Sequence, residues 1–112
     1  MATCLREACL WIPALWWYEL SNALTMAQRQ RRLSQADTAR AIELFGALPL
    51  RTDVALDSGT VWRLHVLARD YGLSAYDAAY MELAQRRGLN LATLDRDLGQ
   101  AASRAGVRLV RL

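Results

Sequence analysis

The sequence predicts an α/β domain that is mostly helical and holds a small, buried parallel sheet. Two short apolar segments, Leu89–Leu94 and Val107–Val110, are joined by a segment over residues 95–105 that has the features of a helix. A strand, a helix and a second strand in this order are typical of a parallel βαβ unit. The chain has 112 residues and 54% apolar content, which suits one domain with a packed core.

The N-terminal part is expected to form a strand and then a helix. Leu10–Ile12 is a short apolar run that Pro13 ends, which predicts a brief strand. From residue 15 to about residue 31, apolar residues recur at the spacing of a helix, which predicts a helix there. One face of this expected helix is made of Leu15, Tyr18, Glu19, Asn22, Ala23 and Met26.

Three further helices are expected over residues 34–48, 54–71 and 74–87. The first has a capping pattern at its start and a proline after its end. Gly72 and Gly88 follow the other two, where glycine commonly ends a helix.

Composition permits a nucleic-acid partner and argues against a membrane protein. The net charge is +3, and all 14 basic residues are arginine, whose planar fork suits phosphate oxygens. The apolar run over residues 8–18 is shorter than the ~20 residues of a spanning helix, and Pro13 interrupts it. Cys4 and Cys9 fit no zinc pattern with the single histidine, so two reduced thiols are expected. A soluble, cytoplasmic protein is the expectation.

Three carboxylates occupy positions where an acid is unexpected or well placed for chemistry. Glu19 lies among the apolar positions of its helix, and Asp77 shares a face with Tyr80 and other apolar residues. Asp95 follows the strand over residues 89–94, and the carboxyl ends of strands are where open parallel sheets bind ligands. Asp97 lies two residues further on. Several acids that approach one point repel one another unless a divalent cation lies among them.

A structural interpretation exists for each acid taken alone. Ser74 and Asp77 form a good N-terminal capping pattern, and Asp95 can cap the helix that follows it. Glu19 can be a solvated residue near a helix start. These interpretations stay open at this point.

The acidic segments resemble those of the PIN domain family, the fold of the VapC-type toxin ribonucleases. Leu73-Ser-Ala-Tyr-Asp-Ala-Ala-Tyr80, then Leu91-Ala-Thr-Leu-Asp-Arg-Asp-Leu98 and Ala105-Gly-Val-Arg-Leu-Val110, are similar to the C-terminal half of such a domain. Ile12-Pro-Ala-Leu-Trp-Trp-Tyr-Glu-Leu-Ser-Asn-Ala-Leu24 is similar to its second acidic motif. The resemblance covers nearly the whole chain from about Cys9, and it implies a three-layer fold with a small parallel sheet between helices.

The resemblance also implies an activity and a site. Glu19, Asp77 and Asp95 would be the catalytic, metal-binding acids, with Asp97 assisting as a metal ligand and Thr93 contacting substrate. Mg²⁺ or Mn²⁺ would be the cofactor and RNA the substrate, which makes the protein a hydrolase. A homodimer and an antitoxin partner, whose segment enters the active-site groove, are implied as well.

Arg29, Arg31 and Arg32 cluster at the end of the first expected helix. They complement the helix dipole or bind the RNA backbone as substrate-binding residues, and the sequence favours neither.

The chain departs from the family pattern at its start. PIN domains begin with a central strand that ends in an aspartate, whereas residues 1–8 hold one acid, Glu7, with no apolar strand before it. We therefore expect a single PIN-like domain over residues 1–112 that is incomplete at its N-terminus and short of one ligand. The sheet should have a gap between residues 10–12 and the strand over residues 89–94, which something should fill, because unpaired edges in a core are unfavourable.

Three hypotheses follow. The first is a metal-dependent ribonuclease toxin, whose first strand lies upstream or comes from another chain. The second is a shortened, inactive PIN protein that acts by binding a partner. The third sets the resemblance aside and predicts a non-enzymatic helical module that binds nucleic acid.

Overall fold

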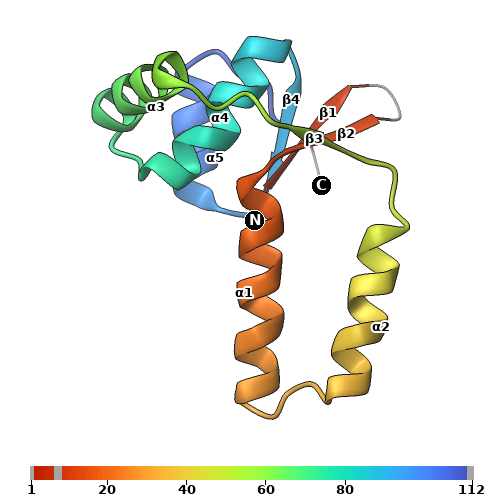
Figure 1. The fold of residues 1–112 in the computed structure, drawn as a ribbon. Coiled ribbons are helices and arrows are strands. Elements are labelled where there is room, and N and C mark those ends of the chain that lie inside the picture. Colours follow the sequence, from red (N-terminus) through yellow and green to blue (C-terminus); the bar gives the residue numbers. More distant parts are fainter. Residues whose placement is uncertain (1, 7–8, 111–112) are drawn as a thin grey trace.

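The computed structural model describes residues 2–6 and 9–110, and it has the expected α/β fold with a small sheet flanked by helices (Figure 1). Glu7 and the side chains of Cys4 and Cys9 lie outside the described part of the chain. In chain order the elements are β1 (Ala2–Arg6), β2 (Cys9–Pro13), α1 (Leu15–Arg29), α2 (Gln35–Gly46), β3 (Leu50–Asp53), α3 (Ser58–Tyr71), α4 (Ala75–Arg87), β4 (Asn90–Thr93) and α5 (Arg96–Arg104).

The four strands form one sheet in the order β3-β2-β1-β4. β2 and β3 are parallel, while β1 is antiparallel to both of its neighbours, with Cys4 opposite Trp11 on β2 and Leu91 on β4. β1 therefore fills the gap that the sequence predicted between β2 and β4. The expectation that residues 1–8 hold no strand was wrong. Two strand edges with unpaired backbone groups favour pairing of any segment within reach, whatever its apolar content.

The C-terminal βαβ unit has the parallel pairing that the sequence predicted, in reduced form. Leu91 and Leu109 form a parallel bridge. The Leu91 amide donates to the Arg108 carbonyl at 2.8 Å, and the Val110 amide donates to the Leu91 carbonyl at 2.8 Å. The pairing is an isolated bridge rather than the full strand expected over residues 107–110.

The segment between α2 and α3 differs from the prediction. The residues of β3 were expected only to connect two helices, and α3 begins at Ser58 instead of residue 54. Asp57 caps α3, since its carboxylate accepts a hydrogen bond from the Thr60 amide at 2.8 Å. Four residues with two charges among them give a weak strand pattern, and this edge strand forms by pairing with β2.

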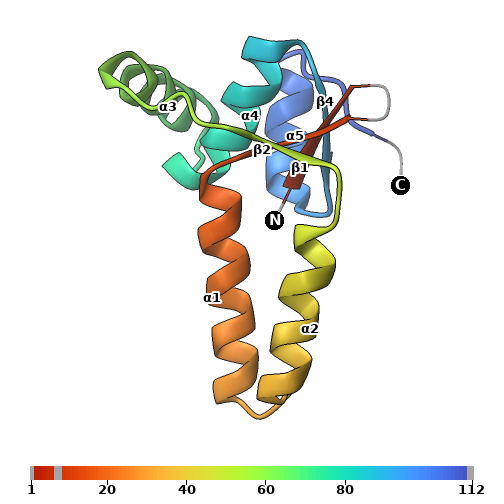
Figure 2. The ribbon, with the colours of Figure 1, turned by 45° about the vertical axis from the view of Figure 1, so that its right-hand side comes forward.

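The buried face of α1 also differs from the prediction. Trp16 and Leu20 are its buried residues, whereas Tyr18 is 75% exposed and Met26 is 40% exposed. The large aromatic Trp16 packs inward against Phe45 of α2, which rotates the helix relative to the expected face. α1 and α2 form a hairpin that extends away from the sheet and from the other three helices (Figures 1 and 2).

The core is centred on α4. Five apolar residues of this helix are buried, and it packs against α3 and across β1, β2 and β4. The residues that meet it in the core include Ile12, Leu91, Leu98 and Ala102. None of the helices in the described part of the chain has the length and apolar character needed to cross a bilayer.

Candidate active site

Glu19 of α1 is held by a residue of α4. The Tyr80 hydroxyl donates to Glu19 Oε1 at 2.8 Å, and Tyr80 itself is 2% exposed. Burial leaves the tyrosine ring few positions, so the hydrogen bond fixes the carboxylate. Within the described part of the chain, the other oxygen of Glu19, Oε2, accepts no hydrogen bond. Asp77 lies almost one turn before Tyr80 on α4, so Glu19 and Asp77 approach each other from two helices.

Asp77 lies in the first turn of α4, after the N-cap residue Ser74. The Ser74 hydroxyl accepts a hydrogen bond from the Asp77 amide at 3.1 Å. The capping pattern that the sequence predicted is therefore present. It places Asp77, which is half-buried, at the end of α4 that faces Glu19.

Asp95 joins β4 to α5. Its Oδ1 accepts hydrogen bonds from the amides of Asp97 at 2.9 Å and Leu98 at 3.1 Å, so Asp95 caps α5 as predicted. The Asp95 amide donates to the Thr93 hydroxyl at 3.0 Å. Oδ2 of Asp95 accepts no hydrogen bond from the residues that the structure describes. Capping therefore orients this carboxylate and leaves one of its oxygens available.

Glu19 and Asp95 both act on Asp77. Burial raises the pKa of Asp77, and the negative charges of Asp95 and Glu19 raise it further. Acids raise the pKa of a neighbouring acid when they lie close to it. The predicted acids on α1 and at the β4–α5 junction therefore each lie near Asp77 of α4.

The cluster is not a ready-made metal site. Within residues 2–6 and 9–110, no three Asp, Glu, His or Cys side chains lie together closely enough to hold a metal ion. The donors are of the right class, since hard divalent cations prefer carboxylate oxygens and Mg²⁺ often keeps several waters. The carboxylates therefore suit a divalent cation by their chemistry and charge, although they are not arranged closely enough to hold it.

The other predicted site residues differ in their placement. Asp97 is exposed in the first turn of α5, next to the cluster. Arg29, Arg31 and Arg32 are exposed at the far end of α1, at the tip of the α1–α2 hairpin (Figure 1). Ten residues separate Glu19 from Arg29, which is about 15 Å along a helix. The structure does not bring these arginines to the carboxylates.

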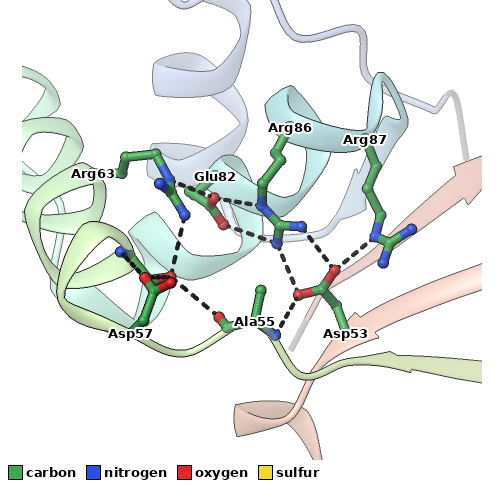
Figure 3. Close-up of polar contacts among 8 residues, drawn as sticks. Asp53, Ala55, Asp57, Arg63, Glu82, Arg86 and Arg87 are labelled. Carbon is green, nitrogen blue, oxygen red and sulfur yellow. Dashed lines mark hydrogen bonds and ion pairs between the residues drawn. The ribbon is translucent and has the colours of Figure 1, made fainter.

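A second polar centre, which the sequence analysis missed, lies at the other end of α4 (Figure 3). Asp53 at the end of β3 is 6% exposed and Glu82 on α4 is 5% exposed. Arg86 donates Nη1 to Asp53 Oδ2 at 3.0 Å and Nη2 to Asp53 Oδ1 at 2.8 Å. Its Nε donates to Glu82 Oε1 at 2.7 Å. Arg87 Nε donates a hydrogen bond to Asp53 Oδ2 at 2.6 Å, and Arg63 Nε of α3 donates one to Glu82 Oε1 at 3.1 Å.

The charges of this centre compensate one another. Burial alone would raise the pKa of Asp53, but hydrogen bonds from Arg86 and Arg87 outweigh it and lower the pKa to about 2. The same bond to Asp53 raises the pKa of Arg86 above its usual value, with Glu82 contributing. Glu82 and Arg86, four residues apart on one helix, were the only local sign of this centre in the sequence. Its partner Asp53 lies 33 residues away, which no local pattern indicates.

We predict that Asp53→Asn lowers the free energy of unfolding at pH 7 by about 3 kcal/mol, because it leaves two guanidinium groups without their buried partner. Denaturant unfolding measures this. Asp53 has a lowered pKa in the folded state, so its contribution is present above about pH 4 and is lost as the pH falls toward 2. The difference between variant and wild type should shrink over that range.

The matched control for this prediction is Asp70→Asn, which removes an exposed ion pair with Arg69. It should cost less than about 1 kcal/mol. Equal losses in the two variants would contradict the assignment of the Asp53 centre as a buried anchor.

A second prediction concerns Asp77. Its raised pKa means that the proton is bound more tightly in the folded than in the unfolded state. Stability from this group is therefore present at low pH and is lost as the pH rises through the folded-state pKa. Asp77→Asn should raise the melting temperature at pH 7 without added metal, and the gain should shrink toward pH 4.

Glu43→Gln, an exposed position on α2, is the control for this melting experiment. The comparison is made by thermal unfolding in EDTA at several pH values. A melting temperature of Asp77→Asn equal to or below that of wild type at pH 7 would show that the acids do not repel one another.

Comparisons with known proteins place these features in context. A protein-family model described as PIN domain matches residues 3–103. The crystal structure of PAE2754 from Pyrobaculum aerophilum is similar to this chain with a TM-score of 0.64 and 32% sequence identity. That match covers 80% of this chain and 60% of PAE2754, so the chain spans about 60% of the length of that protein. A search of curated proteins found no match.

Proposed function

The chain belongs to the PIN domain family, and we propose that it is a metal-dependent endoribonuclease of the VapC toxin type. PIN domains are generally nucleases that use divalent metals, and this general activity is what membership indicates. The observation that carries the proposal is that Glu19 and Asp95, which come from α1 and from the β4–α5 junction, both lie close enough to Asp77 of α4 to raise its pKa. The proposed enzyme acts on RNA in the cytoplasm, with Mg²⁺ or Mn²⁺ as cofactor.

In this proposal each residue near the cluster has a distinct task. Glu19, Asp77 and Asp95 would hold the cation, and Asp97 would assist. A bound divalent cation neutralises charge on the phosphoryl oxygens and lowers the pKa of its water. Tyr80 orients Glu19, and the Thr93 hydroxyl accepts from the Asp95 amide, so both fix the position of a carboxylate. Arg29, Arg31 and Arg32 would contact RNA only at a distance from the site of cleavage.

We predict metal-dependent cleavage of single-stranded RNA by the full chain, abolished by EDTA. Asp77→Asn should lower kcat by at least ~100-fold, because it removes a carboxylate that the reaction needs. Glu43→Gln should cleave like wild type. Cleavage that persists in EDTA, or an Asp77→Asn variant as active as Glu43→Gln, would refute the proposal.

Tyr80→Phe tests the positioning of Glu19. Loss of the hydroxyl that holds a metal-binding carboxylate should raise the Mn²⁺ concentration needed for half-maximal activity by ~10–100-fold. Excess Mn²⁺ should restore activity, which a variant with a damaged fold would not permit. Tyr76→Phe, on the same helix with a 66% exposed side chain, should leave the Mn²⁺ requirement unchanged. An unchanged requirement in Tyr80→Phe would exclude this role.

A second candidate function is a PIN scaffold without catalysis. Two observations favour it. β1 contains no acidic residue, so no described strand contributes an acid to the cluster, and no three acids in the described chain lie close enough to hold a metal. In this reading the protein binds a partner such as an antitoxin or a second copy. The hairpin supports such binding, since Ile42 is 56% and Leu44 is 60% exposed and α2 has no buried residue. The third hypothesis, a non-enzymatic helical module that binds nucleic acid, set the family resemblance aside, whereas the PIN domain model matches residues 3–103.

A further inference from the structure

A groove of about 720 Å³ runs along α5 and begins at the candidate site. Thr93 and Asp95 line the end of the groove that belongs to the carboxylate cluster. The rest of its lining comes from α5 and from two apolar side chains, Leu94 and Leu109. The groove is therefore continuous with the residues that would carry out the reaction.

The α5 side of the groove carries polar and cationic groups on one helix face. Arg96, Gln100 and Arg104 are its members, spaced four residues apart. Residues at this spacing lie one above the other on a helix. Arg96 and Arg104 are eight residues apart, or about 12 Å along the helix axis.

The two arginines differ from those of the Asp53 centre. Three arginines there bind two buried carboxylates, so their charges are used within the protein. Arg96 and Arg104, in contrast, form no ion pair with any residue that the structure describes. The Arg104 guanidinium lies 5.7 Å from the Tyr71 ring centroid, a contact that orients its side chain and leaves its charge available. The groove thus has two cations free to bind an anion.

Part of the groove lining is apolar and accessible. Leu94, which directly precedes Asp95, is 88% exposed, and Leu109 is 39% exposed. A polymer that has both regularly spaced negative charges and flat apolar surfaces matches this combination of lining residues. A nucleic-acid strand has that character, with phosphates for the arginines and base faces for the leucines.

We propose that this groove binds the segment of a single RNA strand that flanks the scissile phosphate, with Arg96 and Arg104 on phosphates and Leu94 against a base. The proposal rests on the nuclease function proposed above and names the path of its substrate. The 12 Å span corresponds to about two to four nucleotides, since stacked nucleotides rise about 3.4 Å each. Only an unpaired strand can turn a base face toward Leu94, because the bases of a duplex are stacked on one another.

The test is binding without cleavage. A fluorescently labelled single-stranded RNA of twelve nucleotides is titrated with the full chain in EDTA, by anisotropy, at several salt concentrations. Arg96→Gln/Arg104→Gln should weaken binding at least tenfold at 0.1 M salt. It should also reduce the slope of log K against log salt by about 1.4, as expected for two lost phosphate contacts on a single strand.

Arg40→Gln/Arg69→Gln is the matched control, because it removes the same charge from exposed positions on α2 and α3. It should keep the wild-type slope. Leu94→Ser should weaken binding several-fold with an unchanged slope, and the duplex of the same sequence should bind more weakly than the single strand. Far-UV circular dichroism and thermal melts check that each variant is folded.

An unchanged slope in Arg96→Gln/Arg104→Gln, an equal loss in the control pair, or equal affinity for the duplex would overturn the proposal. These results are independent of the nuclease experiment, because binding in EDTA requires neither metal nor cleavage. Metal-dependent cleavage by the wild type, together with an unchanged salt slope in Arg96→Gln/Arg104→Gln, would refute only the proposed role of the groove. Groove-dependent binding without cleavage would refute the nuclease alone.

Discussion

The position of the candidate site depends on the pairing of Arg86 with Asp53 and Glu82. α4 is buried on several sides, and it carries Asp77 and Tyr80 toward one end and Arg86 toward the other. The guanidinium of Arg86 ties the second end to β3 through Asp53, while Arg63 ties Glu82 to α3. A buried charge is costly unless opposite charges and hydrogen bonds surround it, so placements of the helix that break this centre are disfavoured. Tyr80, which contacts Glu19, therefore lies on a helix whose position is fixed by ion pairs at its other end.

The second constraint is that sheet edges inside the fold are paired. β1 runs antiparallel to β2 and β4 and pairs with the backbone groups of both strands. On the other side of β4, Leu109 pairs with Leu91. The result is that the acids come from helix starts and from the end of β4 rather than from the centre of the sheet. Helix capping then has two consequences. It satisfies backbone amides at the start of α5, and it orients the Asp95 carboxylate with one oxygen left over.

Local patterns in the sequence were sufficient for some parts of the structure. Glycine and capping residues placed the limits of α4 within a residue, and the order of apolar segments predicted the parallel pairing near Leu91. β1 and β3 were missed because both form by pairing with strands that are already in place. The buried face of α1 was missed because apolar residues lie on both of its sides, and only packing against α2 selects Trp16. The approach of Glu19, Asp77 and Asp95 followed from the family resemblance. The Asp53 centre depends on partners too far apart in sequence for any local pattern.

The contrast between the two acidic centres is the strongest physical argument for function at the first. Asp53 and Glu82 are buried, and each is bound by arginines, so the pKa of Asp53 falls to about 2. Asp77 has neighbours of its own charge and no arginine partner among the described residues, and its pKa is raised. The fold thus compensates buried acids where they hold helices together and leaves repulsion where three elements meet at the end of β4. A carboxylate whose pKa is raised by neighbouring acids is typical of a site that binds a cation or a substrate. The α5 groove adds to this contrast, because Arg96 and Arg104, which form no ion pair with a described residue, line the same groove as Asp95.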